Sequence, residues 1–121
     1  MSEIHYPQYL SFQQSLEEIH NTIAQFNSQS ELNQTALLAA LSQVQELFKQ
    51  EILTINLDEL PKERISLVQS YRTEMHKHLS LLTTDVMFFQ TARQPTTKQQ
   101  RLAQISDRLG ILIRYCDVLL E

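Results

Sequence analysis

One pair of side chains in this sequence is typical of a metal centre, a Glu-x-x-His step formed by Glu17 and His20. On a helix this spacing places the carboxylate and the imidazole on one face, as in di-iron helical bundles. Such a centre needs a second Glu-x-x-His step and further inward-facing carboxylates, and the sequence has no second step. Both residues also lie beside the apolar positions of their segment. We therefore expect an exposed pair and no metal site.

Two later histidines, His76 and His78, lie close together in the sequence. Side chains two residues apart diverge by about 200° around a helix, so these two cannot bind one ion together. Glu74 lies one turn before His78, and we expect a surface contact between them. A histidine phosphotransfer module carries a Lys one turn after its exposed His, and none of these histidines, nor His20, has one there. Phosphotransfer is therefore a minor alternative function.

Cys116 is the single cysteine of the chain, so it cannot form an internal disulfide, and we expect a reducing compartment. It occupies an apolar position, where a buried thiol has a raised pKa and is a poor nucleophile. The sequence contains no Ser–His–Asp order, phosphate-binding loop or glycine-rich turn of the kind that supports catalysis. It predicts a non-catalytic protein without a cofactor.

Composition indicates which elements must position these side chains. The chain has 121 residues, of which 42% are hydrophobic and 20% are charged, and it contains one Gly and three Pro. A sheet protein of this length needs many more turn residues, and a disordered chain would be less apolar. The length suits one domain over residues 1–121. We therefore expect a single all-α domain of a few long helices.

Apolar residues recur at steps of three and four in four segments, which is the pattern of helices with one buried face. The clearest series comprises Leu102, Ile105, Leu109, Leu112, Cys116 and Leu119. We expect a first helix from about 7 to 26, a second from about 31 to 55, a third from the Asp58 cap to about 92 and a fourth after Thr97 to about 119, with breaks near 28–31, 56–60 and 93–97. These repeats and short connections predict an antiparallel four-helix bundle. The alternative fold is a hairpin of two or three helices completed by dimerisation.

The expected helix ends carry recognisable capping patterns. The segments 28–31 and 97–100 both have the capping-box pattern, a hydroxyl residue followed three positions later by Glu or Gln. Asp58 is the expected N-cap of the third helix, with Pro61 in its first turn. Gly110, the single glycine, lies inside the fourth helix, where it costs about 1 kcal/mol relative to Ala. We expect a neighbouring helix to approach closely there.

Charge is unevenly distributed along the chain. The net charge of −4 argues against general nucleic-acid binding, which requires an excess of Lys and Arg. Residues 1–60 carry eight acidic residues and one basic residue, whereas residues 61–121 carry six acidic and nine basic residues. We expect the packed helices to bring these opposite charges together. No apolar stretch approaches the ~18 residues of a membrane span, and the N-terminus lacks a secretory signal pattern, so we expect a cytoplasmic protein.

Two features of the basic half are candidates for partner binding. Beside the main seam of the third helix runs a second apolar row, Leu67, Tyr71, Leu81 and Phe88. This row either packs against a second neighbouring helix or forms a partner-binding patch. The third connection and the start of the fourth helix carry a basic stretch, Arg93, Lys98, Arg101 and Arg108. These bases either neutralise the acidic helices or receive an acidic partner segment.

Three segments resemble a known family. Residues 87–95 (MFFQTARQP), 100–102 (QRL) and 113–119 (IRYCDVL) are similar to the PatD family, small heterocyst frequency control proteins of cyanobacteria. Length, the Tyr-rich start and the helix pattern agree along the whole chain. The resemblance implies a cytoplasmic, all-helical regulator that binds the tubulin-like division protein FtsZ, modulates its filament assembly and links division to cell differentiation. It supplies no catalytic residues.

Bacterial division filaments are acidic overall, so we expect the basic half of the chain to contact such a partner. The candidate partner-binding residues are Phe88, Arg93, Lys98 and Arg101, an aromatic side chain with bases around it near one end of the bundle. In the competing interpretation Phe88 is core and the bases pair with Glu17, Glu18, Glu46 or Glu51. The alternative function is a homodimeric scaffold or an adaptor for another cytoplasmic protein.

Overall fold

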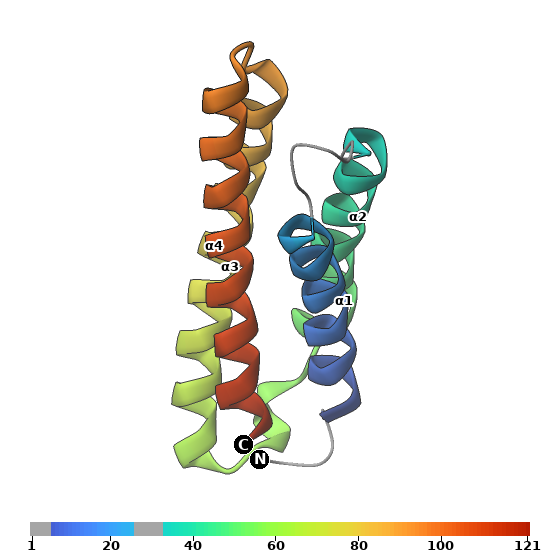
Figure 1. The fold of residues 1–121 in the computed structure, drawn as a ribbon. Helices are drawn as coiled ribbons and strands as arrows, with labels where there is room; N and C mark the ends of the chain where they lie inside the picture. Colours follow the sequence, from blue (N-terminus) through green and yellow to red (C-terminus); the bar gives the residue numbers. More distant parts are fainter. Residues whose placement is uncertain (1–5, 26–32) are drawn as a thin grey trace.

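A computed structural model describes residues 6–25 and 33–121, which form helices and connecting turns without a strand. Figure 1 shows the four long helices of this part of the chain, α1 (Tyr6–Ala24), α2 (Gln34–Leu47), α3 (Lys62–Thr91) and α4 (Pro95–Leu120). Each helix runs in the opposite direction to the one before it (Figure 1). The predicted all-α fold of antiparallel helices is confirmed.

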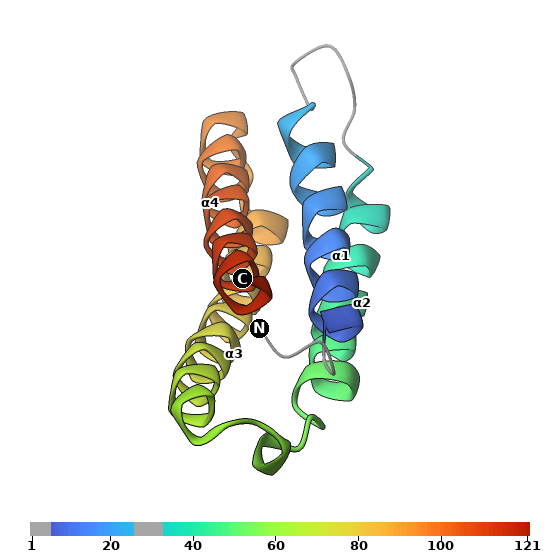
Figure 2. The same ribbon diagram turned by 90° about the horizontal axis from the view of Figure 1, so that it is seen from below.

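The helices form two hairpins that face each other. Figure 2 shows α1 beside α2 in one layer and α3 beside α4 in the other. Helix α4 packs extensively against both α1 and α3, whereas α2 and α3 approach each other less closely. Apolar side chains from all four helices fill the space between the layers, and the fully buried ones include Phe12, Leu16, Phe48, Met75, Leu82, Ile105, Leu109 and Leu112.

Two glutamine side chains hold neighbouring helices together. The Gln13 amide on α1 is buried and donates to the Ile113 carbonyl (3.2 Å) and the Asp117 carboxylate (2.6 Å) on α4. The Gln45 amide on α2 donates to the Thr83 hydroxyl on α3 at 2.7 Å. Because a buried amide without partners costs free energy, these bonds restrict how the two layers align.

Helix α2 does not continue as one regular helix to residue 55. It passes into η2 (Phe48–Ile52), a single π-helical turn in which the Leu53 amide donates to the Phe48 carbonyl at 2.9 Å. Val44, Phe48 and Ile52 follow one another at two consecutive steps of four, and in a regular helix each step would turn the side chain by about 40°. The wider turn keeps both Phe48 and Ile52 buried.

The segment after η2 is held in place from α3. The Arg72 guanidinium donates to the Ile52 carbonyl at 3.1 Å and to the Ile55 carbonyl at 3.0 Å. Both carbonyls lie at the C-terminal end of this helical segment, where a cation is favourable, and the Ile52 carbonyl also accepts from the Ile55 amide at 3.2 Å. A short 3₁₀ turn, η3 (Leu57–Glu59), then leads into α3.

Several helix ends differ from those that the sequence predicted. Asp58 is not the N-cap of α3, because it lies in η3, and Pro61 occupies the position before Lys62 without a side-chain cap. Thr97 is not an N-cap either, since α4 begins at Pro95, whose fixed φ suits a first turn. The predicted capping box at 28–31 lies outside the described residues.

Gly110 does not mark the close approach that its position predicted. A Cβ added there would lie 3.8 Å from Arg114 Nη1 and 3.9 Å from His20 Nε2, which are ordinary van der Waals distances. The space beside Gly110 therefore accommodates a methyl group, and helix packing does not require glycine at this position.

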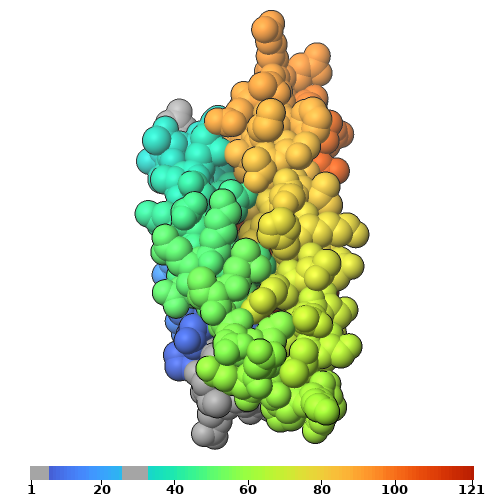
Figure 3. Space-filling view, turned by 180° about the vertical axis from the view of Figure 1, so that it is seen from behind, coloured from blue at the N-terminus to red at the C-terminus, as the bar shows by residue number. Residues whose placement is uncertain are grey.

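The α3/α4 hairpin is longer than the α1/α2 hairpin. Helix α3 has 30 residues and α1 has 19, which at 1.5 Å per residue correspond to roughly 45 Å and 28 Å. The end of the α3/α4 hairpin therefore projects beyond its neighbours, as Figures 1 and 3 show. Within residues 6–25 and 33–121, none of the helices combines the length and hydropathy needed to cross a bilayer.

Candidate partner-binding site

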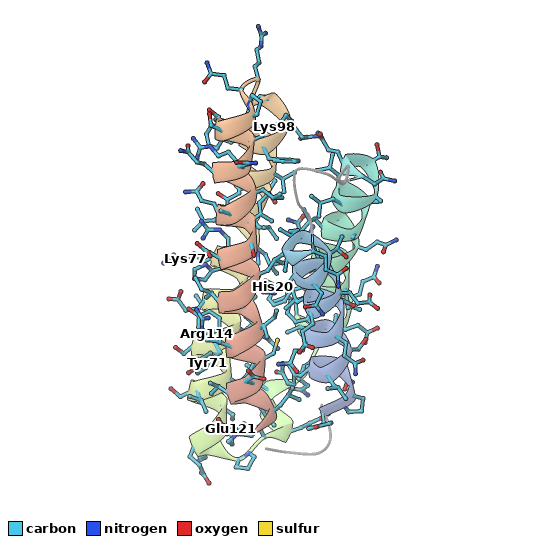
Figure 4. All side chains as sticks on the ribbon, in the orientation of Figure 1. His20, Tyr71, Lys77, Lys98, Arg114 and Glu121 are labelled. Carbon is cyan, nitrogen blue, oxygen red and sulfur yellow. The ribbon has the colours of Figure 1, made fainter. Side chains whose placement is uncertain are left out.

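The projecting end of the α3/α4 hairpin contains the four residues predicted to bind a partner. We call residues 86–106 the hairpin tip; they include the end of α3, the short connection and the first turns of α4. Figure 4 shows Lys98 at this end of the molecule. The hairpin tip has three basic residues and no acidic residue. It therefore carries a positive charge without an acid of its own to neutralise it.

Phe88 lies on the surface of the hairpin tip. Its side chain is 48% exposed, whereas the next residue, Phe89, is 5% exposed and belongs to the core. Consecutive residues of a helix point about 100° apart, so only one of the two rings faces the interior. The competing expectation that Phe88 is core is therefore wrong. Met87, at 59% exposure, is a second large apolar side chain in solvent.

Arg101 on α4 is stacked on this exposed ring. Its guanidinium carbon lies 4.7 Å from the centre of the Phe88 ring, and one of its terminal nitrogens donates to Gln104 Oε1 at 3.0 Å. Stacking on an aromatic face and one hydrogen bond restrict the planar group without neutralising it. The remaining guanidinium donors stay available to a carboxylate, which Arg binds in a two-pronged geometry.

Lys98 has a different role from Arg101. Its ammonium group donates to the Phe89 carbonyl at 3.1 Å and lies 4.6 Å above the centre of the Phe89 ring. This carbonyl belongs to the last turn of α3, where backbone acceptors lack helical partners. Lys98 thus connects the start of α4 to the end of α3. Arg93 in the connection is exposed, and within the described residues it forms no ion pair.

The acidic residues predicted as competing partners do not neutralise these bases. Glu46 lies 3.8 Å from Lys49 on the same face of the α2–η2 segment, and Glu17, Glu18 and Glu51 are exposed. The partners of Lys98 and Arg101 described above all lie within the hairpin tip. Arg93 and Arg101 therefore supply positive charge at the surface.

Arg108, the fourth base of the predicted stretch, is engaged below the hairpin tip. Its Nε lies 2.6 Å from the Asp85 carboxylate, which is buried between α3 and α4. Its Nη1 lies 3.1 Å from His78 Nδ1, and His78 Nε2 lies 3.5 Å from the Tyr115 hydroxyl. We call Asp85, Arg108, His78 and Tyr115 the polar network. Because Arg108 is paired with Asp85, its positive charge is not available to a partner.

The polar network favours the neutral form of His78. Arg108 donates only, so a hydrogen bond between its Nη1 and Nδ1 of His78 requires the neutral tautomer with the proton on Nε2. Burial and the nearby Arg108 charge lower the pKa of His78, while Glu74 opposes them. The expected Glu74 contact is thus secondary, because Glu74 lies 3.8 Å from Lys77.

Sequence reasoning missed the polar network because it joins residues of two helices. The signal was a seven-residue spacing of polar and aromatic residues on both partners, with Tyr71, His78 and Asp85 on α3 facing Arg108 and Tyr115 on α4. A seven-residue step returns to nearly the same side of a helix, so two such rows align when the helices pack. The Tyr71 and Tyr115 rings meet edge to face, with centres 5.3 Å apart.

The second apolar row on α3 divides into two parts. Its lower part is half-buried, since Tyr71 packs against α4 and Leu67 is partly covered. Its upper part is exposed, at 40% for Leu81 and 48% for Phe88. Packing against a neighbouring helix is therefore confirmed for the lower part, and the upper part stays a candidate for partner binding.

His76, His78 and Cys116, which were considered for metal binding and catalysis, have different neighbours. His76 faces Phe48 of η2, with ring centres 6.2 Å apart, whereas His78 faces α4, so the predicted divergence is confirmed. Within the described residues, no three His, Cys, Asp or Glu side chains are grouped to hold a metal ion. Cys116 is buried as predicted, and burial raises the pKa of its thiol to about 12.

A pocket of about 220 Å³ lies between α2 and α3, on the side of the molecule shown in Figure 3. Phe48 and Leu79 provide apolar contacts, and Lys49 and His76 provide polar ones. Because Lys49 is paired with Glu46, the pocket has no clear preference for one charge of ligand. The hairpin tip is the better-defined candidate site.

Comparisons with known proteins give no further guide to the function. No protein-family model, no curated protein and no solved structure matches this chain.

Proposed function

We propose that this protein is a non-catalytic regulator that binds another protein through the hairpin tip. The observation that carries this proposal is the juxtaposition of the exposed Phe88 ring with the Arg101 guanidinium stacked on it, in a segment that has no acidic residue. Aromatic and Arg side chains contribute most of the binding free energy in many protein interfaces. The hairpin tip presents both of them beyond the rest of the helical bundle.

The hairpin tip is suited to docking because its side chains are already ordered. Arg101 is held by Phe88 and Gln104, and Lys98 connects the two helices beside them. Binding a partner then costs less side-chain entropy at Arg101 and Lys98 than it would if these side chains were unrestrained. Arg93 adds a second outward charge that steers an acidic partner toward this end.

The resemblance to the PatD family supports FtsZ as the first partner to test. In this proposal the protein binds FtsZ in the cytoplasm, modulates its filament assembly and thereby links division to heterocyst differentiation. The acidic character expected of division filaments agrees with the positive charge of the hairpin tip. The role of the chain is recognition, and it includes no chemical step.

The test compares two double variants with equal changes in net charge. Arg93→Glu/Arg101→Glu reverses the outward charges of the hairpin tip, and Lys62→Glu/Lys77→Glu reverses two exposed lysines lower on α3. In sedimentation with FtsZ filaments, we expect the first variant to bind at least about tenfold more weakly, with a flatter salt dependence. We expect the control variant to bind within about twofold of the original protein.

The melting temperature of both variants should stay close to that of the original protein, because exposed charge pairs contribute at most ~1 kcal/mol. Equal weakening by both variants would show that only net charge matters and would contradict a specific site. Undiminished binding by folded Arg93→Glu/Arg101→Glu would contradict the site directly.

A further inference from the structure

We infer that the segment docking on this protein is an acidic amphipathic helix that lies along the outer face of the α3/α4 hairpin. We define the outer face by Leu81 and Phe88 on α3 together with Arg93 and Arg101. This inference rests on the proposed function, and it adds the conformation and chemistry of the partner segment. It also adds Leu81, which lies outside the hairpin tip, as a second apolar contact.

The two apolar contacts lie on one side of α3. Leu81 and Phe88 are seven residues apart, so their directions differ by about 20° around the helix and their positions by about 10.5 Å along it. Both remain substantially exposed, at 40% and 48%. Met87 points about 100° away from Phe88 and so belongs to another side of α3.

The spacing of these contacts favours a helical partner over an extended one. A helix presents side chains of one face at a repeat of seven residues, about 10.5 Å, which matches the separation of Leu81 and Phe88. An extended strand presents side chains of one face about 6.7 or 13.4 Å apart, because alternate residues point to opposite sides. A strand therefore contacts one of the two residues well and the other poorly.

The charges of the outer face favour an acidic partner. Arg101 retains free donors above Phe88, and Arg93 is exposed beyond it. Asp85, the acidic residue of α3 that lies between Leu81 and Phe88 in sequence, is buried and paired with Arg108 at 2.6 Å. No acidic residue from 86 to 106 opposes a negatively charged segment. Carboxylates near one end of the bound helix would meet both arginines.

A second copy of this chain fits this face less well than a separate acidic helix. In a symmetric dimer the same patch meets itself, which places Arg93 and Arg101 of both protomers in one interface. The hairpin tip has three bases and no acid to compensate that repulsion. From Leu81 to Thr91, the last residue of α3, the helix rises by about 15 Å, so about three turns of a partner helix cover it.

The experiment uses a fluorescein-labelled peptide as the probe of binding. The peptide has 16 residues, with Leu at positions 4, 8 and 11 on one face, Glu on both flanks and Ala elsewhere. A second peptide carries Pro at position 9, which breaks the helix, and a third carries Lys in place of every Glu. In fluorescence anisotropy we expect the Pro peptide to bind at least about tenfold more weakly than the first and the Lys peptide to show no binding.

Three protein variants test which face of the hairpin is used. We expect Leu81→Ser and Phe88→Ser each to weaken binding of the acidic helix at least about fivefold. Met87→Ser, which removes a more exposed apolar side chain on another side of α3, should leave it within about twofold. All three positions are exposed, so far-ultraviolet circular dichroism should show folded proteins.

The outcomes separate this inference from the proposed function. Equal binding of the Pro peptide would overturn the helical partner, and equal weakening by Met87→Ser and Leu81→Ser would overturn the outer face. If Leu81→Ser leaves FtsZ binding intact while Arg93→Glu/Arg101→Glu abolishes it, the inference fails and the proposed function holds. If the acidic helix binds as described and FtsZ does not, the surface holds and the identity of the partner is wrong.

Discussion

Two regions of the α3/α4 hairpin each hold an arginine in place, but the charge of that arginine has a different role in each region. In the polar network, Arg108 lies beside a buried carboxylate and an imidazole, and its charge is neutralised by the carboxylate between the helices. In the hairpin tip, Arg101 lies on the Phe88 ring and its charge stays in solvent. An arginine paired with an acid stabilises the fold, whereas an arginine held by an aromatic ring remains available to a partner.

The two regions differ in burial because they lie at different heights along the α3/α4 hairpin. The polar network lies where α3 and α4 are accompanied by the other layer of helices, and the hairpin tip projects beyond it (Figures 1 and 4). An unpaired charge costs much free energy between packed helices and little where it is exposed to solvent. Substitutions at Arg108, Lys98 and His78 test this contrast.

The largest effect should follow removal of the arginine in the polar network. Arg108→Ala leaves the Asp85 carboxylate, whose side chain is 9% exposed, without its cation. We expect the free energy of unfolding to fall by about 2–4 kcal/mol, which is measurable by urea denaturation. Lys77→Ala is the matched control, because Lys77 lies 3.8 Å from Glu74 in an exposed pair, and it should cost less than about 0.5 kcal/mol. Similar losses in both variants would contradict the contrast.

A smaller effect is expected at Lys98, within the hairpin tip. Lys98→Met keeps most of the side-chain length but removes the hydrogen bond to the Phe89 carbonyl and the charge above the Phe89 ring. We expect a loss of about 1 kcal/mol in urea denaturation and a change in partner binding below threefold. The opposite result, unchanged stability with binding reduced more than tenfold, would assign Lys98 to the docking surface.

The smallest effect concerns the dependence of stability on pH. The pKa of His78 is lowered in the folded protein, so the unfolded chain takes up a proton at this ring near pH 6.5 while the folded chain does not. The folded protein should therefore lose stability as pH falls below about 6.5 and gain none from this group above it. Urea denaturation between pH 7.5 and 5.5 measures this slope. His78→Gln should flatten the slope, and an unchanged slope would show that another group causes it.

The helices could be predicted because apolar residues recur at helical spacing within each one. Phe12 and Leu16 on α1, or Leu109 and Leu112 on α4, occupy the apolar steps that the sequence shows, and all four are buried. The ends were less predictable, since Asp58 and Thr97 are both good capping residues that other local choices displaced. Proline at 61 and 95 decided where those helices begin.

The candidate site was predictable by residue type and not by contact. An aromatic residue beside a basic stretch pointed to Phe88 and Arg101, but the engagement of Lys98 with Phe89 depends on how tightly the connection turns. The pairing of Asp85 with Arg108 depends on the relative register of α3 and α4, which neither helix specifies alone. A shift of one residue would point either side chain about 100° away.

The π-helical turn at Phe48–Ile52 has a consequence for how this chain tolerates changes of length. Such a turn has the geometry of a regular helix into which one residue has been inserted, so everything after it is rotated by about 100° and displaced by about 1.5 Å. Deleting Gln50, which is exposed, would restore an ordinary helix but turn Ile52 and Ile55 away from the Arg72 guanidinium that holds their carbonyls. A homologue one residue shorter in this segment would thus need a different anchor from α3.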